Sequence, residues 1–433
     1  MTVVLQGGAE PSFFMKKTFS IISLGCPRNL TDSERLISEY EKKGYMFREE
    51  PDGSDIVLIN TCAFIKDAKV ESIDTILKVI EAKKNGSVKK IIVAGCLPQR
   101  YPVELKKELK EVDEFRGIVE FDPDPSKDLS ARLTPPHYSY VKISEGCYNR
   151  CTYCVIPYLK GGYKSRKLES VIKEAEFLIK KGVKEVVLIG QDASMYGIDL
   201  YGKKRLSELL RKLSGVCGKN WLRLLYAHPS NLERDAIKAI RDSGNICKYI
   251  DLPVEHINDM ILKRMGRKAG KDAILSLIKF IRKEIPGVAI RSSLIVGFPG
   301  ETEKEFQELL SFMRDIRFER LGIFRYSREE GTPAHDFKAQ VSEQEKERRF
   351  DEAMLLQQEI SMGINEKLKG RVLKVLIDEK NEEQYIGRTE YDAPEVDGNV
   401  YVKGKGLKPG SFYDVRITDT YEYDLVGEAE KQS

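Results

Sequence analysis

The sequence predicts an α/β protein of more than one domain, and three observations lead to this prediction. Short β-branched runs alternate with helical patterns over the first quarter of the chain, which is typical of parallel βαβ units. Six further strand-like runs recur in the middle of the chain, with helical segments between them. Short strands separated by glycine-rich turns follow near the end. The 433 residues also exceed what one hydrophobic core usually supports, so we expect three domains.

The first domain is expected over residues 16–120, as a small α/β domain. Its strand-like runs read TFSIISLG, SDIVLIN and KKIIVAG. One helix is predicted over residues 31–44, where Thr-Asp resembles an N-cap and a glycine closes the segment, and another over about 64–82. We expect residues 1–15 to be a disordered tail, because Met15 followed by two lysines looks like a natural start.

The second domain is expected over residues 138–368, after a linker at 121–137 that is rich in Pro, Asp and Ser. Its strand-like runs are YSYVKIS, KEVVLIG, WLRLLYA, KYIDLPV, VAIRSSLIVG and RLGIFRYS, and a long helical pattern follows at 341–368. Six βα units fit either an open doubly wound sheet or a curved partial barrel, and their spacing does not choose between the two. In both cases the working face lies at the carboxyl ends of the strands.

Residues 369–433 predict a small antiparallel β-barrel. The short strands VLKVLIDE, QYIGRTE, GNVYVKGKG and SFYDVRITDTYEYDLVGEA alternate there with glycine-rich turns. From residue 370 onward nine Lys and Arg residues stand against fourteen Asp and Glu residues, a net of −5 in a chain whose total is +4. An acidic domain repels phosphate and suits a basic protein partner.

Composition limits the class of protein. With 41% hydrophobic and 32% charged residues the chain resembles an ordinary soluble protein. No apolar stretch approaches the roughly 20 residues that cross a bilayer, and the N-terminus lacks the pattern of a signal peptide. We therefore expect a cytoplasmic protein without a membrane partner. Eight cysteines are too few for a disulfide scaffold, so clustered cysteines here indicate metal binding or catalysis.

The first cysteine cluster is Cys147, Cys151 and Cys154, which directly follow a predicted strand with C-x3-C-x2-C spacing. Three thiolates suit a 4Fe-4S cube and leave one iron without a protein ligand, where a cofactor can bind. A zinc site would need a fourth ligand nearby, and His137 stands on the far side of the strand. A redox pair would leave Cys147 unexplained.

The second cluster is predicted from Cys26, Cys62 and Cys96, which follow the carboxyl ends of three strands of the first domain. These ends lie side by side in a parallel sheet, so the three thiols can converge on a second metal cluster. Single cysteines at such places are usually packed core residues, and we expect this role for Cys217 and Cys247. The histidines His228, His256 and His335 are likewise expected to be structural.

The first trio, with the aromatic Tyr153 just before its last cysteine, resembles the radical S-adenosylmethionine enzymes. The resemblance implies a partial (βα)6 barrel rather than an open sheet, and a cofactor whose amino and carboxylate groups chelate the open iron. A tight β-to-α loop without a ligand remains the structural alternative for the segment SSLIVGFPGET. The cofactor contacts that the resemblance implies are Tyr153, Gln191, Asp192, Arg291, Gly297 and Glu301.

Over nearly the whole chain the sequence is similar to the methylthiotransferases, which add a TRAM-like C-terminal barrel. The phrases that carry the similarity are LGCPRN, NTCAFI, AGCLPQRY, KISEGC, GFPGET and GRTEYDAPEVDG. One branch modifies an adenosine in transfer RNA, and the other an aspartate in the twelfth protein of the small ribosomal subunit. NTCAFI, APEVDG and the acidic terminal domain favour the ribosomal branch. Two departures are Glu255, where the family suggests Gln, and Lys160, where Arg is usual.

The resemblance also implies a mechanism. An electron from the first cluster cleaves S-adenosylmethionine, and the 5'-deoxyadenosyl radical takes hydrogen from the aspartate β-carbon. The second 4Fe-4S cluster carries the sulfur, and another S-adenosylmethionine supplies the methyl group. The expected partners are the ribosomal protein and a flavodoxin-like or ferredoxin-like electron donor, without a stable homo-oligomer. A non-enzymatic iron-sulfur carrier is the rival class, disfavoured because carriers usually bind each cluster with four cysteines.

Overall fold

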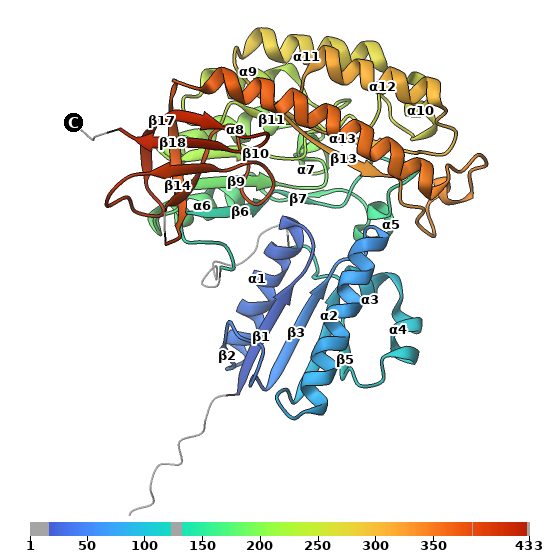
Figure 1. Cartoon of the computed structure of the whole chain (residues 1–433). Helices are drawn as coiled ribbons and strands as arrows, with labels where there is room; N and C mark the ends of the chain where they lie inside the picture. The colour runs from blue at the N-terminus through green and yellow to red at the C-terminus, as the bar shows by residue number, and fades with distance from the viewer. Residues whose placement is uncertain (1–16, 123–131, 383, 431–433) are drawn as a thin grey trace, which may run out of the picture.

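The computed structural model describes residues 17–122, 132–382 and 384–430. The expected tail at 1–15 and most of the expected linker at 121–137 lie outside these residues. Figure 1 shows an α/β unit below, a larger α/β unit above it, and a small β-barrel beside the larger unit. Among the described residues, no helix combines the length and the apolarity needed to cross a bilayer.

The N-terminal unit is a parallel sheet with strand order β2-β1-β3-β4-β5, covered by helices on both faces. All six residues of the central strand β3 are buried, as expected for a strand covered on both sides. Its strands are β1 (Thr18–Ser23), β2 (Met46–Phe47), β3 (Ile56–Thr61), β4 (Lys90–Gly95) and β5 (Glu114–Phe115). Its helices are α1 (Pro27–Lys42), α2 (Lys66–Lys84), α3 (Cys96–Arg100) and α4 (Pro102–Glu108).

Helix α1 begins four residues earlier than the sequence analysis expected. Pro27 is its first residue and Cys26 is the N-cap, so the prediction of an N-cap at Thr31 is wrong. Proline is favoured at this position because its fixed φ suits a helix and its missing N–H would be unpaired there anyway. The earlier start places Cys26 at the positive end of the helix dipole, where a thiolate is stabilised.

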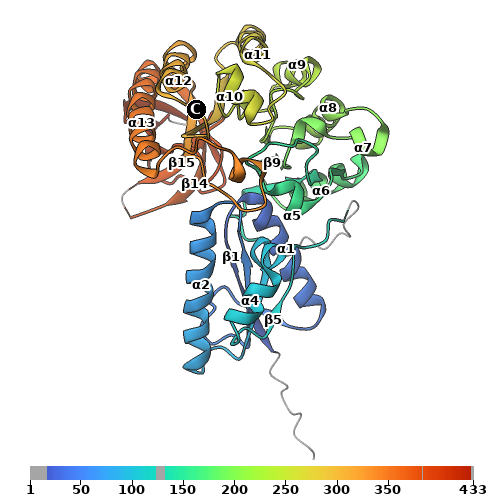
Figure 2. The same ribbon diagram turned by 90° about the vertical axis from the view of Figure 1, so that its right-hand side faces the viewer.

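The central unit is a curved partial barrel of six parallel strands rather than an open doubly wound sheet. Two three-stranded sheets, β10-β9-β6 and β11-β12-β13, meet through the bridge between Leu222 and Ile246. The larger helices form an arc outside the strands in Figure 2. The strands are β6 (Tyr138–Lys142), β9 (Glu185–Ile189), β10 (Trp221–Leu224), β11 (Tyr249–Asp251), β12 (Ala289–Val296) and β13 (Arg320–Arg325).

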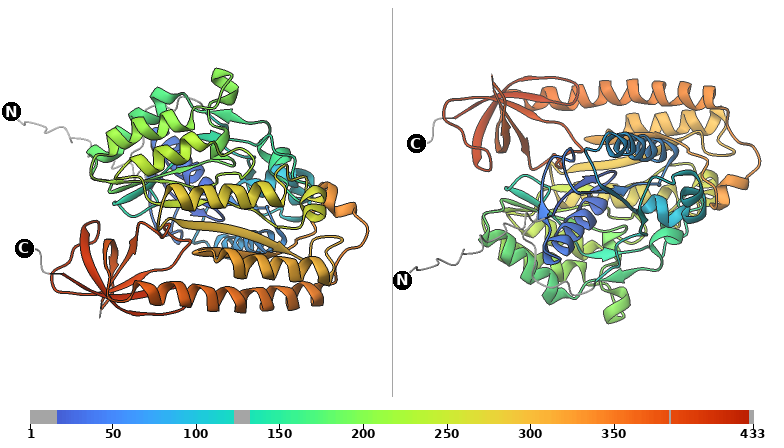
Figure 3. Two further views of the ribbon diagram at one scale, coloured as in Figure 1. Left: turned by 90° about the horizontal axis from the view of Figure 1, so that it is seen from above. Right: turned by 90° about the horizontal axis from the view of Figure 1, so that it is seen from below.

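The helices of this unit pack on the outward faces of the strands and form the largest core. The longer ones are α6 (Leu168–Lys180), α8 (Leu206–Cys217), α9 (Arg234–Asp242), α11 (Lys271–Glu284), α12 (Glu303–Ile316) and α13 (Glu343–Asn365). The shorter elements are β7 (Ser144–Glu145), α5 (Ile156–Lys160), β8 (Lys164–Ser165), α7 (Ile198–Tyr201) and α10 (Asp259–Arg264). Helix α13 confirms the long helix expected after the sixth strand, and Figure 3 shows that it ends at the C-terminal barrel.

The C-terminal unit is a closed barrel with strand order β14-β15-β16-β18-β17. Its pairs are antiparallel except for β16 and β18, which run parallel. The strands are β14 (Val372–Lys380), β15 (Tyr385–Thr389), β16 (Val400–Lys403), β17 (Phe412–Thr420) and β18 (Leu425–Ala429).

Residues 388–397, which we call the barrel plug, fasten this unit to the amino ends of the central strands. The plug contains the phrase APEVDG except for its last residue, Gly398, and the plug residues Asp392, Ala393 and Pro394 are buried. The first residues of four central strands bond to it: Tyr138 to Glu395, Glu185 to Arg388, Tyr249 to Asp397 and Arg320 to Asp392. The C-terminal barrel therefore contacts the amino ends of the central strands, and the N-terminal unit lies at their carboxyl ends.

Candidate functional site

The first cysteine trio lies at the carboxyl end of β6, in a loop held on both sides. Thr152 anchors this loop, because its N–H donates to the carbonyl of Met265 at 2.9 Å and its own carbonyl accepts from Ala334 N–H at 2.9 Å. Gly266 lies so close that an added Cβ would stand 2.7 Å from the Arg150 carbonyl oxygen. The loop geometry is therefore fixed by packing before any ligand binds.

The three thiols of this trio are near enough to influence one another's ionisation. Burial raises the pKa of Cys147 to about 11, and the neighbouring Cys151 adds to this shift. Burial also raises the pKa of Cys154, followed by the charges of Cys151 and Cys147. Thiols in this state need a bound cation to become thiolates together.

The three cysteines of the second trio follow the carboxyl ends of the neighbouring strands β1, β3 and β4. Gly25, with φ of +90°, brings the first of these ends close to the second: an added Cβ would lie 3.1 Å from Cys62 Sγ. Cys96 Sγ lies 3.9 Å from Asn29 Oδ1 on α1. Burial raises the pKa of Cys96 to about 12, and the charges of Cys62 and Cys26 contribute to the shift.

Arg28 sets Cys26 apart from the other two. Burial alone would raise the pKa of Cys26, but the charge and hydrogen bond of Arg28 outweigh burial and lower it. The same guanidinium donates to the carbonyl of Gly190, at the end of β9, at 3.1 Å and stacks over the Tyr226 ring at 4.4 Å. Arg28 thus links the second trio to the central barrel, and no periodicity in the sequence indicated this role.

The donor set of both trios suits a four-iron cube, because thiolates are its usual protein ligands. All six cysteines are free thiols in the structure. The described residues hold no group of three or more Cys, His, Asp or Glu side chains arranged for one metal ion. A cube has a separate iron for each thiolate, so its ligands stand further apart than those of a single ion. Cys217 and Cys247 are buried elsewhere in the core.

A buried quartet of charged side chains joins the N-terminal unit to the central partial barrel between the two trios. Its members are Asp32, Lys142, Glu145 and Lys160. Asp32 on α1 pairs with Lys142 on β6 and lies 3.0 Å from Lys160 Nζ on α5. Lys142 Nζ also lies 2.8 Å from Glu145, and these two lysines lower the pKa of Glu145 to about 2 against the effect of burial. Lys160, which replaces the usual arginine, keeps a positive charge here and favours the thiolate of Cys96.

Two predicted cofactor residues at the end of β9 lie close to this region. Gln191 donates to Glu145 of the charge quartet. Asp192 accepts from Asn149 Nδ2 at 2.7 Å, and the Asn149 N–H points to Cys147 Sγ at 3.3 Å. The structure therefore brings Gln191 and Asp192 together with the first trio.

Tyr153 and Glu255 line a cavity of about 730 Å³ between the N-terminal unit and the barrel. Phe64, two residues after Cys62, lines it from the other side, with Phe324 of β13. Burial raises the pKa of Glu255, which favours its neutral form.

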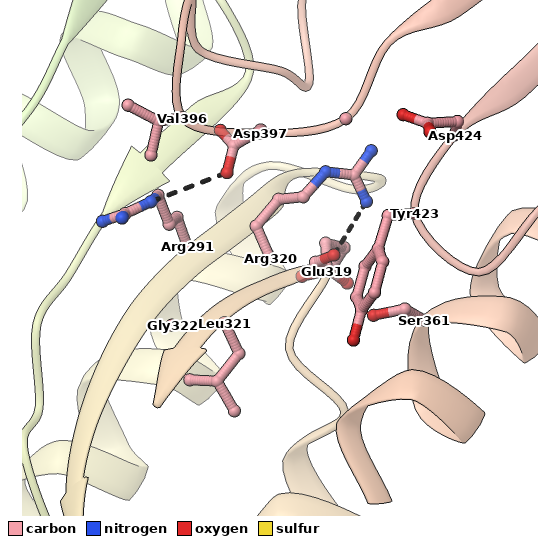
Figure 4. Close-up of a pocket in the computed structure, with 11 residues that line it drawn as sticks. Arg291, Glu319, Arg320, Leu321, Gly322, Ser361, Val396, Asp397, Tyr423 and Asp424 are labelled. Carbon is pink, nitrogen blue, oxygen red and sulfur yellow. Dashed lines mark hydrogen bonds and ion pairs between the residues drawn. The ribbon is translucent and has the colours of Figure 1, made fainter. Parts of the chain in front are cut away.

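The other three predicted cofactor residues make contacts within the protein. Gly297 N–H donates to the Glu301 carboxylate at 3.1 Å, and that carboxylate also accepts from Arg349 of α13 at 2.8 Å. Arg291 pairs with Asp251 at 2.9 Å and lies 3.6 Å from Asp397 of the barrel plug. Figure 4 shows it in a separate cavity of about 280 Å³, toward the C-terminal barrel. These three cofactor assignments stay predictions.

Comparison with known families divides the chain as its architecture does. Residues 141–313 match the model of the Radical SAM superfamily. Residues 18–117 match Uncharacterized protein family UPF0004, and residues 370–429 match the TRAM domain.

Whole-chain relatives are similar over almost the full length. The chain is 44% identical to "Ribosomal protein uS12 methylthiotransferase RimO" of Acetivibrio thermocellus, covering 97% of this chain and 100% of the relative. It is 44% identical to the protein of the same name from Clostridioides difficile, covering 94% of this chain and 97% of the relative.

Solved structures support the fold alone. The radical S-adenosylmethionine methyltransferase TsrM from Kitasatospora setae matches with a TM-score of 0.52 and 13% identity, covering 82% of this chain and 79% of that one. The cobalamin-dependent radical enzyme OxsB matches with a TM-score of 0.50 and 13% identity, over 79% of this chain and 56% of that one.

Proposed function

Because the chain belongs to the ribosomal protein uS12 methylthiotransferase family, we propose that it transfers a methylthio group to that ribosomal protein by radical S-adenosylmethionine chemistry. It is an enzyme that transfers sulfur-containing groups, with two 4Fe-4S clusters and S-adenosylmethionine as cofactors. The acceptor we propose is the β-carbon of an aspartate. A C–H bond at such a carbon is too weakly acidic for ordinary acid-base catalysis, so a radical route is required.

One observation supports the proposal: residues that stand close in sequence to a cysteine of each trio line one cavity. Tyr153 is adjacent to Cys154 and Phe64 follows Cys62 by two residues, and both aromatic side chains line the cavity of about 730 Å³. A carrier of electrons would not need such a space. A transferase that joins a radical step to a sulfur step needs it, because both clusters must reach the same substrate carbon.

We assign Cys147, Cys151 and Cys154 to the cluster that cleaves the cofactor, and Cys26, Cys62 and Cys96 to the cluster that provides sulfur. When bound by Cys147, Cys151 and Cys154, the first cluster would supply the electron for reductive cleavage of S-adenosylmethionine. The chain's own residues fix the geometry. Thr152 holds the first loop and Arg28 joins the second trio to the barrel.

The same cavity is the proposed site of S-adenosylmethionine. Tyr153, Gln191 and Asp192 lie around the first trio and are the assignments that its surroundings support best. For Arg291, Gly297 and Glu301 the internal contacts described above indicate indirect roles, in which they hold β12 and the loop after it. A flavodoxin-like or ferredoxin-like donor, a monomeric enzyme and a cytoplasmic location complete the proposal.

The decisive experiment expresses the chain in a heterologous host that lacks its own methylthiotransferases. Mass spectrometry of ribosomal protein uS12 and of total transfer RNA then shows which molecule gains a methylthio group. We expect the added mass on an aspartate of the protein, and on no nucleoside. A methylthio-adenosine in transfer RNA with an unmodified protein would overturn the assignment.

A further inference from the structure

The turn after β10, His228-Pro229-Ser230, is connected to the first cysteine trio by a chain of hydrogen bonds through Asn231, Asp192 and Asn149, although the sequence predicted a structural role for His228. The His228 N–H donates to Ser194 Oγ at 3.1 Å, and its carbonyl accepts from Asn231 N–H at 2.9 Å. Asn231 Nδ2 reaches Asp192 at 2.7 Å. Asn149 donates to the same carboxylate, and the backbone N–H of Asn149 points to Cys147 of the first trio.

The proton of the His228 ring is placed by its neighbours. Ser230 N–H donates to Nδ1 at 3.2 Å, so Nδ1 is the acceptor and the ring proton sits on Nε2. Burial, together with the charges of Arg267, Lys268 and Lys204, lowers the pKa of His228 to about 2. The ring is therefore neutral, with Nε2–H as its donor.

Two donors of this turn have no acceptor among the described residues. His228 is only 7% exposed, and neither its Nε2 nor the buried Ser230 Oγ has a hydrogen-bond partner there. A buried donor without a partner costs about 1–3 kcal/mol, so two in adjacent positions indicate a missing acceptor. The positive field of the three nearby cations favours an anionic acceptor.

The chain contains a second turn of the same kind, in which a protein carboxylate lies close to the ring although it accepts no hydrogen bond from Nε2. Asn258 N–H donates to His256 Nδ1 at 3.0 Å, as Ser230 does to His228. The His256 Nε2 then lies 3.5 Å from the carboxylate of Glu301. At His228 the described residues place no acceptor within hydrogen-bond distance of Nε2.

We propose that His228 Nε2–H and Ser230 Oγ–H bind a carboxylate of a ligand, in the positive field of Arg267, Lys268 and Lys204. Asp192, the acidic group beside the turn, already accepts from Asn149, Asn231 and Ser194. The inference rests on the proposed function, which offers two sources of a carboxylate: the amino-acid end of S-adenosylmethionine and the aspartate of the target protein. The link to Cys147 through Asn149 favours the cofactor.

The test measures binding to the reconstituted enzyme by equilibrium dialysis, with S-adenosylmethionine and its decarboxylated analogue as probes. His228→Leu removes the donor, and His228→Gln retains an N–H near the same place. We expect His228→Leu to bind S-adenosylmethionine about tenfold more weakly, the loss typical of a hydrogen bond to a charged group, and to bind the analogue unchanged. His228→Gln should recover most of the affinity, and Ser230→Ala should show a smaller loss in the same direction.

A second arm uses the ribosomal protein with its target aspartate intact or replaced by asparagine. A loss in His228→Leu that depends on the aspartate, with cofactor binding unchanged, assigns the site to the target. The surface variant His335→Gln serves as control, and iron content reports on folding. If His228→Leu and Ser230→Ala bind every probe as the wild type does, the inference is wrong. A wild type that prefers the carboxylated cofactor but leaves the ribosomal protein unmodified would refute the proposed function alone.

Discussion

Cys151 and Cys26 supply the same kind of ligand in two different places, so their loss is expected to separate two chemical steps. Cys151→Ala removes a ligand of the cluster that cleaves the cofactor, and deoxyadenosine production should stop. Cys26→Ala should spare deoxyadenosine production and stop methylthio transfer. Both products are measured by chromatography after anaerobic reconstitution and reduction. Deoxyadenosine from the Cys151 variant would contradict the assignment of the first trio.

Iron analysis gives the same prediction a readout that does not depend on turnover. Each variant should retain roughly half of the wild-type iron, since a cube held by two thiolates is lost more readily than one held by three. Cys217→Ala is the matched control, because Cys217 is buried in the core away from both trios and should keep the full iron content. Equal iron in all four proteins would mean that the trios do not bind clusters.

For single residues, the sequence predicted which cysteines form the two trios, but not which side chains lie around them. The trios were recognisable because each cysteine follows a strand, and the parallel sheets then bring them together. Arg28 and His228 gave no such signal. Their roles depend on contacts with Gly190, Tyr226 and the cations of a distant loop, which only the assembled fold creates.

Among the elements, helix α1 carries both a cluster cysteine at its start and a buried carboxylate six residues later. Asp32 faces Lys142 and Lys160, which belong to the barrel, and its side chain is 3% exposed. Asp32→Ala leaves two buried cations with Glu145 as their one acidic partner in the quartet, and breaking such a network costs about 3–5 kcal/mol. We expect faster amide exchange along α1 and β6, measured by mass spectrometry.

The control for this prediction is an exposed ion pair on another helix of the same unit. Lys84 and Glu81 on α2 are both more than half exposed, so Lys84→Ala should leave the exchange pattern unchanged. Slower or unaltered exchange in the Asp32 variant would mean that the quartet does not hold the two units together.

The course of α1 also shows why element boundaries were harder to predict than elements. The Thr-Asp pair resembled an N-cap, yet Pro27 starts the helix and Thr31 lies within it. Local propensity allowed both starts. The packing of Leu36 and Ile37 against the sheet and of Asp32 against the barrel is consistent with the earlier one.

For the whole molecule, the sequence predicted the three kinds of unit but not how they assemble. Glu185 and Arg388 are 203 positions apart, and no pattern links them. Their pairing places the C-terminal barrel at the amino ends of the central strands, opposite the cysteines. The phrase APEVDG, which favoured the ribosomal branch, is therefore part of a buried contact between domains.

This assembly makes a prediction for Arg388→Met. The variant leaves the fully buried Glu185 with Arg223 as its remaining cation and removes two bonds to Asp378. Because an unpaired buried charge is strongly destabilising, we expect the docked barrel to open more readily by about 3 kcal/mol. Amide exchange should rise in β6 and β9, whereas Lys369→Ala, at an exposed pair, should not alter it.

Both cysteine trios lie at the other end of the strands, so the Arg388→Met variant should keep its full iron content and still cleave the cofactor below its unfolding temperature. Loss of iron together with the rise in exchange would show instead that the C-terminal barrel supports the clusters directly.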